Sequence, residues 1–373
     1  MTARKPASSP VGTASANAGA RLRDQPPPSA GWRAQVEADL ESLFASAAGA
    51  PRTRSATSQL RRFRAQGGRL EPVSAPARRG REPAIGAGTE GQLVYAIGDI
   101  HGRYDLLLGL MGEILGDRER GDARRPALVF LGDYLDRGPD SGLVLEALVW
   151  LTRRAPADIC LLKGNHEQAL LEFLDAPEQA GPWLQFGGYE TLDAYGVERP
   201  DHQDAADLAR ARDDILAAMP ASHLRVLQGL DVMALIGGYV FVHAGLAPGR
   251  PLASQREADL LWIRGPFLEA ARPCEGVVVH GHTWRGAEPE LLDRRIGVDT
   301  GAYTTGVLTA IRLDGDTRRV LQARDEQAGW PTKSAAASPR LVSRPVDFRE
   351  GGWSVNLALG AAGLPWSRPA LTT

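Results

Sequence analysis

Short apolar runs alternate with helical patterns over the central part of the chain. The runs at residues 93–97, 127–131 and 159–162 are each followed by a glycine within two residues. Leucines at helical spacing separate them at 106–115 and 143–151. Strands that alternate with helices in this way are typical of an α/β sheet. The pattern predicts a strand–helix–strand–helix–strand unit.

The second half of the chain adds strands without long helices between them. Apolar runs predict these strands at residues 232–236, 239–242, 277–280 and 307–313. Gly237-Gly238, between the first two runs, predicts a tight hairpin turn. The segment before these strands, 170–230, has a mostly helical pattern. Beyond Arg324 clear periodicity is lost, and we expect one short strand there, at 353–357.

The first 90 residues have a different pattern. Residues 1–31 are rich in Ala, Ser, Pro and Gly, and such a segment cannot bury enough apolar surface to offset its ordering entropy, so we expect disorder. Residues 32–46 predict one short amphipathic helix that docks on the rest of the protein. Its apolar positions are Trp32, Val36, Leu40, Leu43 and Phe44.

Arginines are dense over residues 51–82, where interleaved Pro and Gly argue against one long helix. We expect a solvated basic linker. The alternative is a binding site for an acidic partner or nucleic acid, but only Phe63 offers a stacking surface, so nucleic acid is not expected. Residues 1–90 carry 14 Lys or Arg and 7 Asp or Glu, a net charge of +7, against −9 for the rest. A basic leader thus precedes an acidic body.

The composition is that of an ordinary water-soluble protein, with 43% hydrophobic and 24% charged residues among 373. No run of about 18 apolar residues predicts a membrane span, and no apolar segment after Met1 predicts a secretory signal. The two cysteines, Cys160 and Cys274, suit a reducing compartment. We therefore expect a cytoplasmic location and a packed, unreactive thiol at Cys160.

Polar residues gather where the predicted strands end. The three earlier strands are followed by Gly98-Asp99-Ile100-His101-Gly102, Gly132-Asp133-Tyr134-Leu135-Asp136-Arg137-Gly138 and Gly164-Asn165-His166-Glu167, and two later ones by His243-Ala244-Gly245 and His280-Gly281-His282-Thr283. Each motif alone is weak, because Gly-Asp pairs are common in turns and strand-end histidines are often structural. Five such motifs, each directly after a predicted strand, argue against coincidence. Since ligands bind at the carboxyl ends of such strands, we expect one site suited to divalent metal ions.

In this order the motifs GDIHG, GDYLDRG, GNHE, HAG and GHT resemble those of the phosphoprotein phosphatase branch of the calcineurin-like metallophosphoesterases, over roughly residues 92–313. The resemblance implies an α/β fold, a four-layer αββα sandwich with two mixed sheets and a dinuclear metal centre at its lip. We accordingly divide the chain into a largely disordered leader (1–90), a catalytic domain (91–325) and a mostly irregular tail (326–373).

The resemblance also assigns metal ligands. Asp133 would bridge two ions. The other ligands would be Asp99 and His101 for the first ion, and Asn165, His243 and His282 for the second. Manganese is expected, with iron or zinc as alternatives, because Asp, Asn and His suit all three. The two ions would lower the pKa of a shared water, and the bridging hydroxide would attack phosphorus directly.

The catalytic and phosphate-binding roles fall on the same motifs. His166 would protonate the leaving alkoxide, Asp136 would orient that imidazole, and Arg137 would hold the phosphate with its guanidinium fork. Asn165 would also contact the phosphate. Arg264 is the candidate for a second phosphate-binding arginine, and the alternative is a surface arginine at the end of a helix.

Two departures from the family pattern bear on the substrate. Trp284 stands where many diesterases of this superfamily carry a second histidine ligand, which favours a phosphatase. His243-Ala244-Gly245 replaces the His-Gly-Gly of eukaryotic protein phosphatases and also occurs in bacterial relatives that cleave diadenosine tetraphosphate. We predict a protein serine/threonine phosphatase acting on a phosphoprotein or phosphopeptide. A dinucleoside polyphosphate hydrolase and an inactive binding module are the alternatives.

Overall fold

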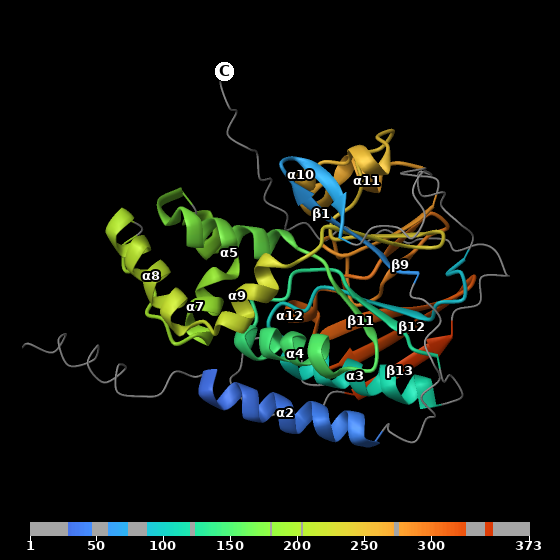
Figure 1. Ribbon diagram of the computed structural model, residues 1–373, viewed down its shortest axis with the longest axis horizontal. Coiled ribbons are helices and arrows are strands. Elements are labelled where there is room, and N and C mark those ends of the chain that lie inside the picture. Colours follow the sequence, from blue (N-terminus) through green and yellow to red (C-terminus); the bar gives the residue numbers. More distant parts are fainter. Residues whose placement is uncertain are drawn as a thin grey trace, which may run out of the picture.

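The structure is a computed structural model that describes residues 29–46, 59–73, 88–119, 124–179, 181–202, 204–271, 276–325 and 340–345. Two β-sheets pack face to face, and helices cover the outer face of each (Figure 1). This is the predicted α/β fold, a four-layer αββα sandwich with two mixed sheets.

One sheet contains the strands predicted in the first half of the chain. Its order within the described residues is β13 (Arg340–Pro345), β12 (Thr317–Arg324), β11 (Val307–Asp314), β3 (Val94–Ile97), β4 (Ala127–Phe130) and β5 (Asp158–Leu161). Strands β3, β4 and β5 are parallel, and the other neighbours are antiparallel. The carboxyl ends of the three parallel strands therefore lie at one edge of the sheet.

The second sheet contains three of the four later predicted strands, since the one predicted at 307–313 is β11 of the first sheet. Its order is β2 (Arg69–Pro72), β1 (Arg61–Gln66), β6 (Met233–Ile236), β7 (Tyr239–Val242), β8 (Val277–His280), β10 (Arg295–Gly297) and β9 (Glu290–Leu291). Gly237 joins β6 to β7 with a positive φ of 53°, the conformation that the predicted hairpin turn requires. Strands β7, β8 and β10 are parallel, so their carboxyl ends also share one edge.

Helices form the outer layers. They are α2 (Ser29–Ser46), α3 (Tyr104–Glu119), α4 (Ser141–Arg154), α5 (Asn165–Asp175), α6 (Gly181–Trp183), α7 (Tyr189–Ala194), α8 (Ala205–Ala218), α9 (Ala221–Gln228), α10 (Glu257–Trp262), α11 (Gly265–Leu268) and α12 (Ala302–Thr305), with a π-helical turn at Leu184–Gly188. Helices α3 and α4 cover the first sheet, and α10 and α11 cover the second. Helices α5 to α9 gather at one side of the sandwich (Figure 1).

A dry core between the two sheets holds them together. Side chains such as Val129, Phe241 and Ile311 are fully buried in it, and each contributes roughly 1.5–3 kcal/mol by leaving water. Cys160 is packed in the same core, and burial raises the pKa of its thiol far above the ordinary value. This agrees with the predicted packed thiol.

The predicted amphipathic helix before the domain is α2, which docks on α3 and α4 (Figure 1). Val36 and Leu40 are fully buried against these helices, and Phe44 packs on Trp150 with ring centroids 5.2 Å apart. Disorder was expected for residues 1–31, but residues 29–31 belong to α2, and residues 1–28 lie outside the described residues.

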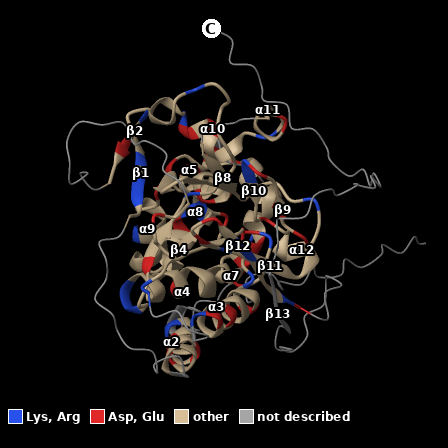
Figure 2. Ribbon diagram, turned by 90° about the vertical axis from the view of Figure 1, so that its right-hand side faces the viewer, with Lys and Arg blue, Asp and Glu red and all other residues tan. Residues whose placement is uncertain are grey.

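The interpretation of residues 51–82 as a solvated linker is wrong for residues 61–72. Strand β1 pairs antiparallel with β6, and β2 pairs with β1. Arg64 and Arg62 lie on β1, whose ribbon is blue for Lys and Arg in Figure 2. Their side chains lie 2.9 and 3.6 Å from the carboxylate of Asp231. Phe63 packs on the outer face of the sheet. The buried carboxylate of Asp231 and this apolar face together hold an arginine-rich strand in the sheet.

Strand β13 extends the first sheet from within the predicted tail, and the strand expected at 353–357 lies outside the described residues. The division into leader, catalytic domain and tail remains a prediction. In the part of the chain that the structure describes, no helix combines the length and apolar character needed to cross a bilayer.

Candidate metal centre

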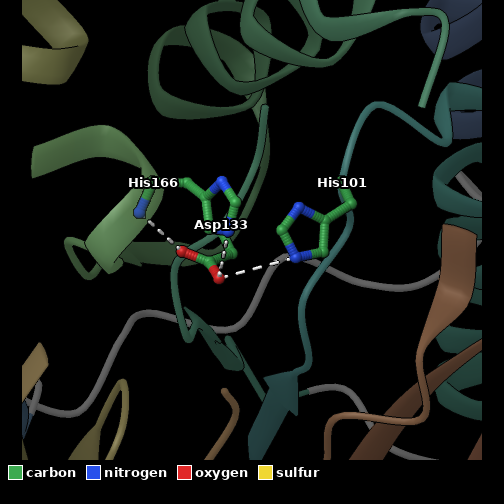
Figure 3. A group of neighbouring side chains, drawn as sticks. All are labelled: His101, Asp133 and His166. Atoms are coloured by element: carbon green, nitrogen blue, oxygen red, sulfur yellow. Dashed lines mark hydrogen bonds and ion pairs between the residues drawn. The ribbon is translucent and has the colours of Figure 1, made fainter. Parts of the chain in front are cut away.

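Side chains from the strand ends of both sheets meet at one edge of the sandwich. Two groups of three residues bring their ligand atoms within 4.8 Å of one another. One group is His101, Asp133 and His166, and the other is Asp133, His243 and His282. Figure 3 shows the first group, with the carboxylate of Asp133 between the two imidazoles. Asp133 belongs to both groups, which is the placement expected of a bridging residue.

The distances around Asp133 suit coordination. Its Oδ2 lies 3.5 Å from Nε2 of His101, and its Oδ1 lies 3.4 Å from Nε2 of His243. The same nitrogen of His243 lies 2.9 Å from Oδ1 of Asn165. Two ligand atoms bound at right angles about 2.1 Å from one metal ion lie about 3 Å apart. These four side chains therefore have the spacing of neighbouring metal ligands.

Backbone carbonyls fix the tautomers of two histidines. Nδ1 of His101 donates to the carbonyl of Leu135 at 2.9 Å, and Nδ1 of His243 donates to the carbonyl of Leu131 at 2.8 Å. The lone pair of each ring is then on Nε2, which faces Asp133. Lone pairs and a carboxylate that face one another repel unless a cation lies among them, so this donor set fits a divalent metal ion.

The protonation states of the histidines and of Asp133 also suit a metal centre. Burial is the first cause that lowers the pKa of His101, His243 and His282, and the neutral imidazole is the form that binds metal. Burial alone would raise the pKa of Asp133, but positive charge on the surrounding histidines outweighs burial and lowers it. With neutral imidazoles, a metal ion among the rings would supply the positive charge that keeps Asp133 ionised.

Asp99, a predicted ligand, lies outside both groups of three. Its Oδ2 accepts a hydrogen bond from the backbone N–H of His282 at 2.9 Å, whereas its Oδ1 is buried without a hydrogen-bond partner among the described residues. A Cβ atom at Gly281 would lie 2.0 Å from this Oδ1, so only glycine leaves room for it. A buried carboxylate oxygen without a partner fits a cation at this position.

The family follows from a direct comparison. Residues 93–303, which include every strand-end motif, match the family model of the calcineurin-like phosphoesterases. The chain belongs to this family. Phosphoesterases of this family use divalent metal ions, and the protein is therefore a metallophosphoesterase, a hydrolase, as predicted.

The proteins similar to this phosphoesterase are named either as protein phosphatases or as dinucleoside tetraphosphatases. Serine/threonine-protein phosphatase 1 of Salmonella typhimurium is 30% identical over 231 residues, which are 59% of this chain and 91% of that protein. A symmetrical bis(5'-nucleosyl)-tetraphosphatase of Aromatoleum aromaticum is 32% identical over 271 residues, 70% and 83% of the two chains. The solved cold-active protein-tyrosine phosphatase of a psychrophilic Shewanella aligns over 73% of this chain and 97% of its own at 18% identity, with a TM-score of 0.41.

Buried hydrogen bonds hold His166 in its place within the first group. Its Nδ1 and Oδ2 of Asp136 lie 2.7 Å apart. The Asp136 carboxylate also accepts from the indole of Trp183 at 2.8 Å and from the hydroxyl of Thr191 at 2.6 Å. Nη2 of Arg137 lies 3.1 Å from Nε2 of His166. The predicted trio of His166, Asp136 and Arg137 is thus one connected unit.

Arg137 borders an open pocket of about 530 Å³ at the surface of the phosphoesterase. Its Nη1 donates to the hydroxyl of Tyr303 at 2.6 Å, and its guanidinium lies 4.6 Å from the centre of the Tyr303 ring. The other lining residues are Gln185, Phe186, Gly187, Glu190 and Thr304. A group attached to a phosphate at Arg137 would therefore have room to extend outward.

Arg264 lies beside the second group. Its Nε donates to Nε2 of His282 at 3.0 Å, so it is not simply a surface residue after α10. Trp284 covers Gly301, where a Cβ would lie 2.6 Å from its ring, and the edge of its ring faces Tyr303. The indole of Trp284 has no lone pair that could bind a metal ion.

Asp299 is a buried carboxylate of the site that the sequence interpretation missed. Burial, followed by the charge of Asp299, raises the pKa of Asp99, and burial raises the pKa of Asp299 itself to about 6. Asp299 follows a strand, as the other site residues do. The strand before it, β10, has only three residues and begins with Arg295. The sequence therefore contains no apolar run that predicts a strand end at Asp299.

Glu167 belongs to a predicted motif but had no predicted role. Its carboxylate accepts backbone N–H groups of Asp133, Tyr134 and Gly164, at 2.8, 2.7 and 2.8 Å. Burial and the charge of Asp133 raise its pKa to about 7. Glu167 ties together the two loops that carry Asp133 and Asn165.

Proposed function

We propose that this phosphoesterase is a protein serine/threonine phosphatase that hydrolyses phosphomonoesters of phosphoproteins. The observation that carries the proposal is the connected unit of His166, Asp136 and Arg137, whose histidine lies in one of the two groups of possible metal ligands. Such a unit combines a proton donor for an alkoxide with a fork for a terminal phosphate. Trp284 supports a monoester substrate, because it cannot serve as the extra histidine ligand of diesterase relatives.

Two divalent ions, with manganese the first choice, complete the proposed site. Their ligands would be Asp99, His101, Asp133, Asn165, His243 and His282. When bound, the ions supply an activated water and positive charge for the phosphoryl oxygens.

Two arginines approach the proposed phosphate position from different sides. Arg137 contacts His166 of the first group, and Arg264 contacts His282 of the second. A phosphate dianion is a stronger acceptor for a guanidinium than an imidazole nitrogen is. Substrate would therefore draw both arginines away from the histidines, with the amide of Asn165 as a further donor.

His166 is the proposed general acid. Burial lowers its pKa, but the charge of Asp133 and the hydrogen bond with Asp136 outweigh burial, and the pKa is raised. With Nδ1 held by Asp136, the proton for transfer is on Nε2, the atom that Arg137 releases when it turns to the phosphate. A raised pKa favours the protonated imidazole that can donate to an alkoxide.

Replacing His166 tests this division of roles. His166→Asn should keep its metal ions and lose about 10²- to 10⁴-fold in kcat toward phosphoserine peptides, because it removes the acid and not a ligand. Metal content of the purified variant and its kcat should be measured side by side. Loss of metal from His166→Asn would instead make His166 a ligand and contradict the assignment.

The dinucleoside polyphosphate hydrolase remains a second candidate, because the Aromatoleum relative with that name is as similar as the phosphatase. The deciding experiment supplies the full chain with Mn²⁺ and compares kcat/KM on phosphoserine, phosphothreonine and phosphotyrosine peptides and on diadenosine tetraphosphate. Preference for the phosphoserine or phosphothreonine peptides is expected. Cleavage of the dinucleotide alone would reject the protein phosphatase.

A further inference from the structure

Trp32, near the start of α2, sits in a slot that the fold leaves for it. A Cβ atom at Gly142, in the first turn of α4, would lie 2.3 Å from the outer edge of the Trp32 indole. The indole also stacks on His223, with planes 13° apart and centroids at 6.1 Å. It meets the ring of Tyr195 edge-on at 5.2 Å. Trp32 therefore joins α2 to α4, to α9 and to the end of α7.

The groups under Trp32 form a buried polar network. Nδ1 of His223 lies 2.7 Å from the hydroxyl of Tyr195, and its Nε2 lies 2.9 Å from Glu146 of α4. Arg33, the neighbour of Trp32, contacts the other oxygen of Glu146 at 3.5 Å. Since His223 is fully buried, Trp32 and Arg33 cover a network that would otherwise face water.

This network adjoins the residues that hold Asp136. Ser141 precedes Gly142, and its hydroxyl accepts the backbone N–H of Asp136 at 3.1 Å. Thr191, one helical turn before Tyr195, donates to the Asp136 carboxylate. The hydroxyls of Ser141 and Thr191 also lie 3.1 Å apart. Trp32 thus contacts two of the elements that fix Asp136, α4 and the end of α7, while a third, α6, holds it through Trp183.

We propose that Trp32 is a positioning residue for the phosphoesterase reaction, which acts through α4 and α7 on Asp136 and so on His166. The inference rests on the proposed general-acid role of His166. Without the indole, the first turn of α4 and the end of α7 lose their common contact, and Asp136 loses a fixed position. Small displacements of a catalytic group are enough to slow proton transfer markedly.

Leaving-group dependence separates positioning from a purely structural role. Phenolate is a strong base that needs the proton, whereas 4-nitrophenolate is a weak base that leaves without it. The full chain with Mn²⁺ is assayed on phenyl phosphate and 4-nitrophenyl phosphate. Trp32→Ala should lose about tenfold in kcat on phenyl phosphate and less than about twofold on 4-nitrophenyl phosphate, with KM unchanged on both.

Three further variants make the result specific. Trp32→Phe keeps a ring in the slot and should restore most of the activity on phenyl phosphate. Gly142→Ala adds the Cβ that meets the indole, and it should reproduce Trp32→Ala although alanine alone favours a helix. Phe44→Ala removes a ring at the opposite end of α2, where it packs on Trp150, and should leave the ratio of the two kcat values unchanged.

His166→Asn provides the reference. If it shows no leaving-group dependence, the proposed general acid is wrong. If it shows the dependence and Trp32→Ala does not, or if Phe44→Ala shows it equally, the positioning role of Trp32 is wrong. If Trp32→Ala does not fold, Trp32→Phe and Gly142→Ala decide by the same ratio.

Discussion

Among single residues, unusual backbone conformations concentrate at the metal centre. His101, Asp133, Asp136, Arg137 and His282 have φ values between 46° and 71°, a left-handed region that side chains other than glycine seldom adopt. Among the described non-glycine residues, only Glu90 shares this feature outside the site. Strain of this kind, about 1–3 kcal/mol per residue, persists where neighbouring structure enforces it. The backbone therefore holds these side chains in place before a metal ion or substrate arrives.

Asp299 should contribute to metal binding although no motif contains it. Its carboxylate is buried beside Asp99 and shares that charge-rich region with Asp133. Asp299→Asn should lower metal affinity about 10- to 100-fold, as loss of a supporting group does at metal sites. Isothermal titration of the metal-free protein with Mn²⁺ measures this directly.

Asp133→Asn is the comparison for that titration. It removes the charge at the centre of both groups and should abolish binding at one site at least. Equal affinity in Asp299→Asn and the unaltered chain would show that Asp299 serves only the local fold.

Much of the site could be predicted because its residues follow recognisable strands in compact motifs. His101, Asp133, Asn165, His243 and His282 lie close together as expected, whereas Asp99 lies beside His282 but outside both groups. Their roles as ligands stay predictions. Trp183 and Thr191, which hold Asp136, could not be predicted, because they lie in the helical segment between the two halves and no local pattern links them to the site. Arg264 was found from its place between two histidine motifs.

Among the elements, the start of α4 carries an ionisable group at a cost to stability. Burial, then the charge of Asp105, raises the pKa of Asp140 to about 6. A carboxyl whose pKa rises on folding destabilises the protein above that pKa and has no effect below the unfolded value near 4. Asp140→Asn should therefore stabilise by about 1–2 kcal/mol at pH 7.5 and by almost nothing at pH 4. Urea unfolding at the two pH values checks this, and an equal gain at both would contradict it.

Strand β1 should depend on its counter-charge in the core. Replacing both Arg62 and Arg64 with Gln leaves Asp231 buried without its cations, which should cost about 1–3 kcal/mol because both arginines are partly exposed. Adding Asp231→Asn should recover most of that loss. Chemical denaturation of the unaltered protein, the double Arg→Gln variant and the variant that adds Asp231→Asn measures the loss and the recovery.

Arg69→Gln is the matched control, because Arg69 is exposed on the neighbouring strand β2. It should change stability by less than about 0.5 kcal/mol. An equal loss from Arg69→Gln would mean that general charge, and not the pairing with Asp231, stabilises the hairpin.

The hairpin could not be predicted because its sequence is polar and its partners are distant. The hairpin packs through few apolar side chains, which are Phe63, Ala65 and Leu70. The carboxylate that pairs with its arginines is on Asp231, far along the sequence. Elements with sustained apolar runs, such as β3 and β7, were placed within a residue. Strand identity at β1 is set by tertiary contacts that overrule local propensity.

At the scale of the whole molecule, the metal centre joins the two sheets. Asp133 extends from the first sheet and His243 from the second, and they are 3.4 Å apart. Ions that bind only this assembled edge should stabilise the fold. Saturating Mn²⁺ should raise the unfolding temperature by about 5–10 °C over the metal-free protein. Calorimetry with and without EDTA measures the shift, and no shift in a protein that holds its metal would contradict it.

Parts of the leader, residues 1–90, are packed into the fold. Helix α2 and strand β1 contact the body extensively, so deleting residues 1–90 would damage the fold as well as any partner site. The alternative that residues 51–82 bind an acidic partner is better tested by replacing arginines outside the two strands, such as Arg52, Arg54 and Arg78, with Gln. Unchanged partners in this variant would contradict that alternative.

The pairing of β1 with β6 has a consequence for how the protein is made. Phe63 pairs with Met233, so the strand leaves the ribosome about 170 residues before its partner. At 5–20 residues per second, the edge of β1 that later pairs with β6 stays open for roughly 8 to 34 s, although β2 can pair with the other edge at once. An apolar strand left open for that time would invite aggregation, whereas arginines discourage it. The residues that later neutralise Asp231 thus also protect the nascent chain.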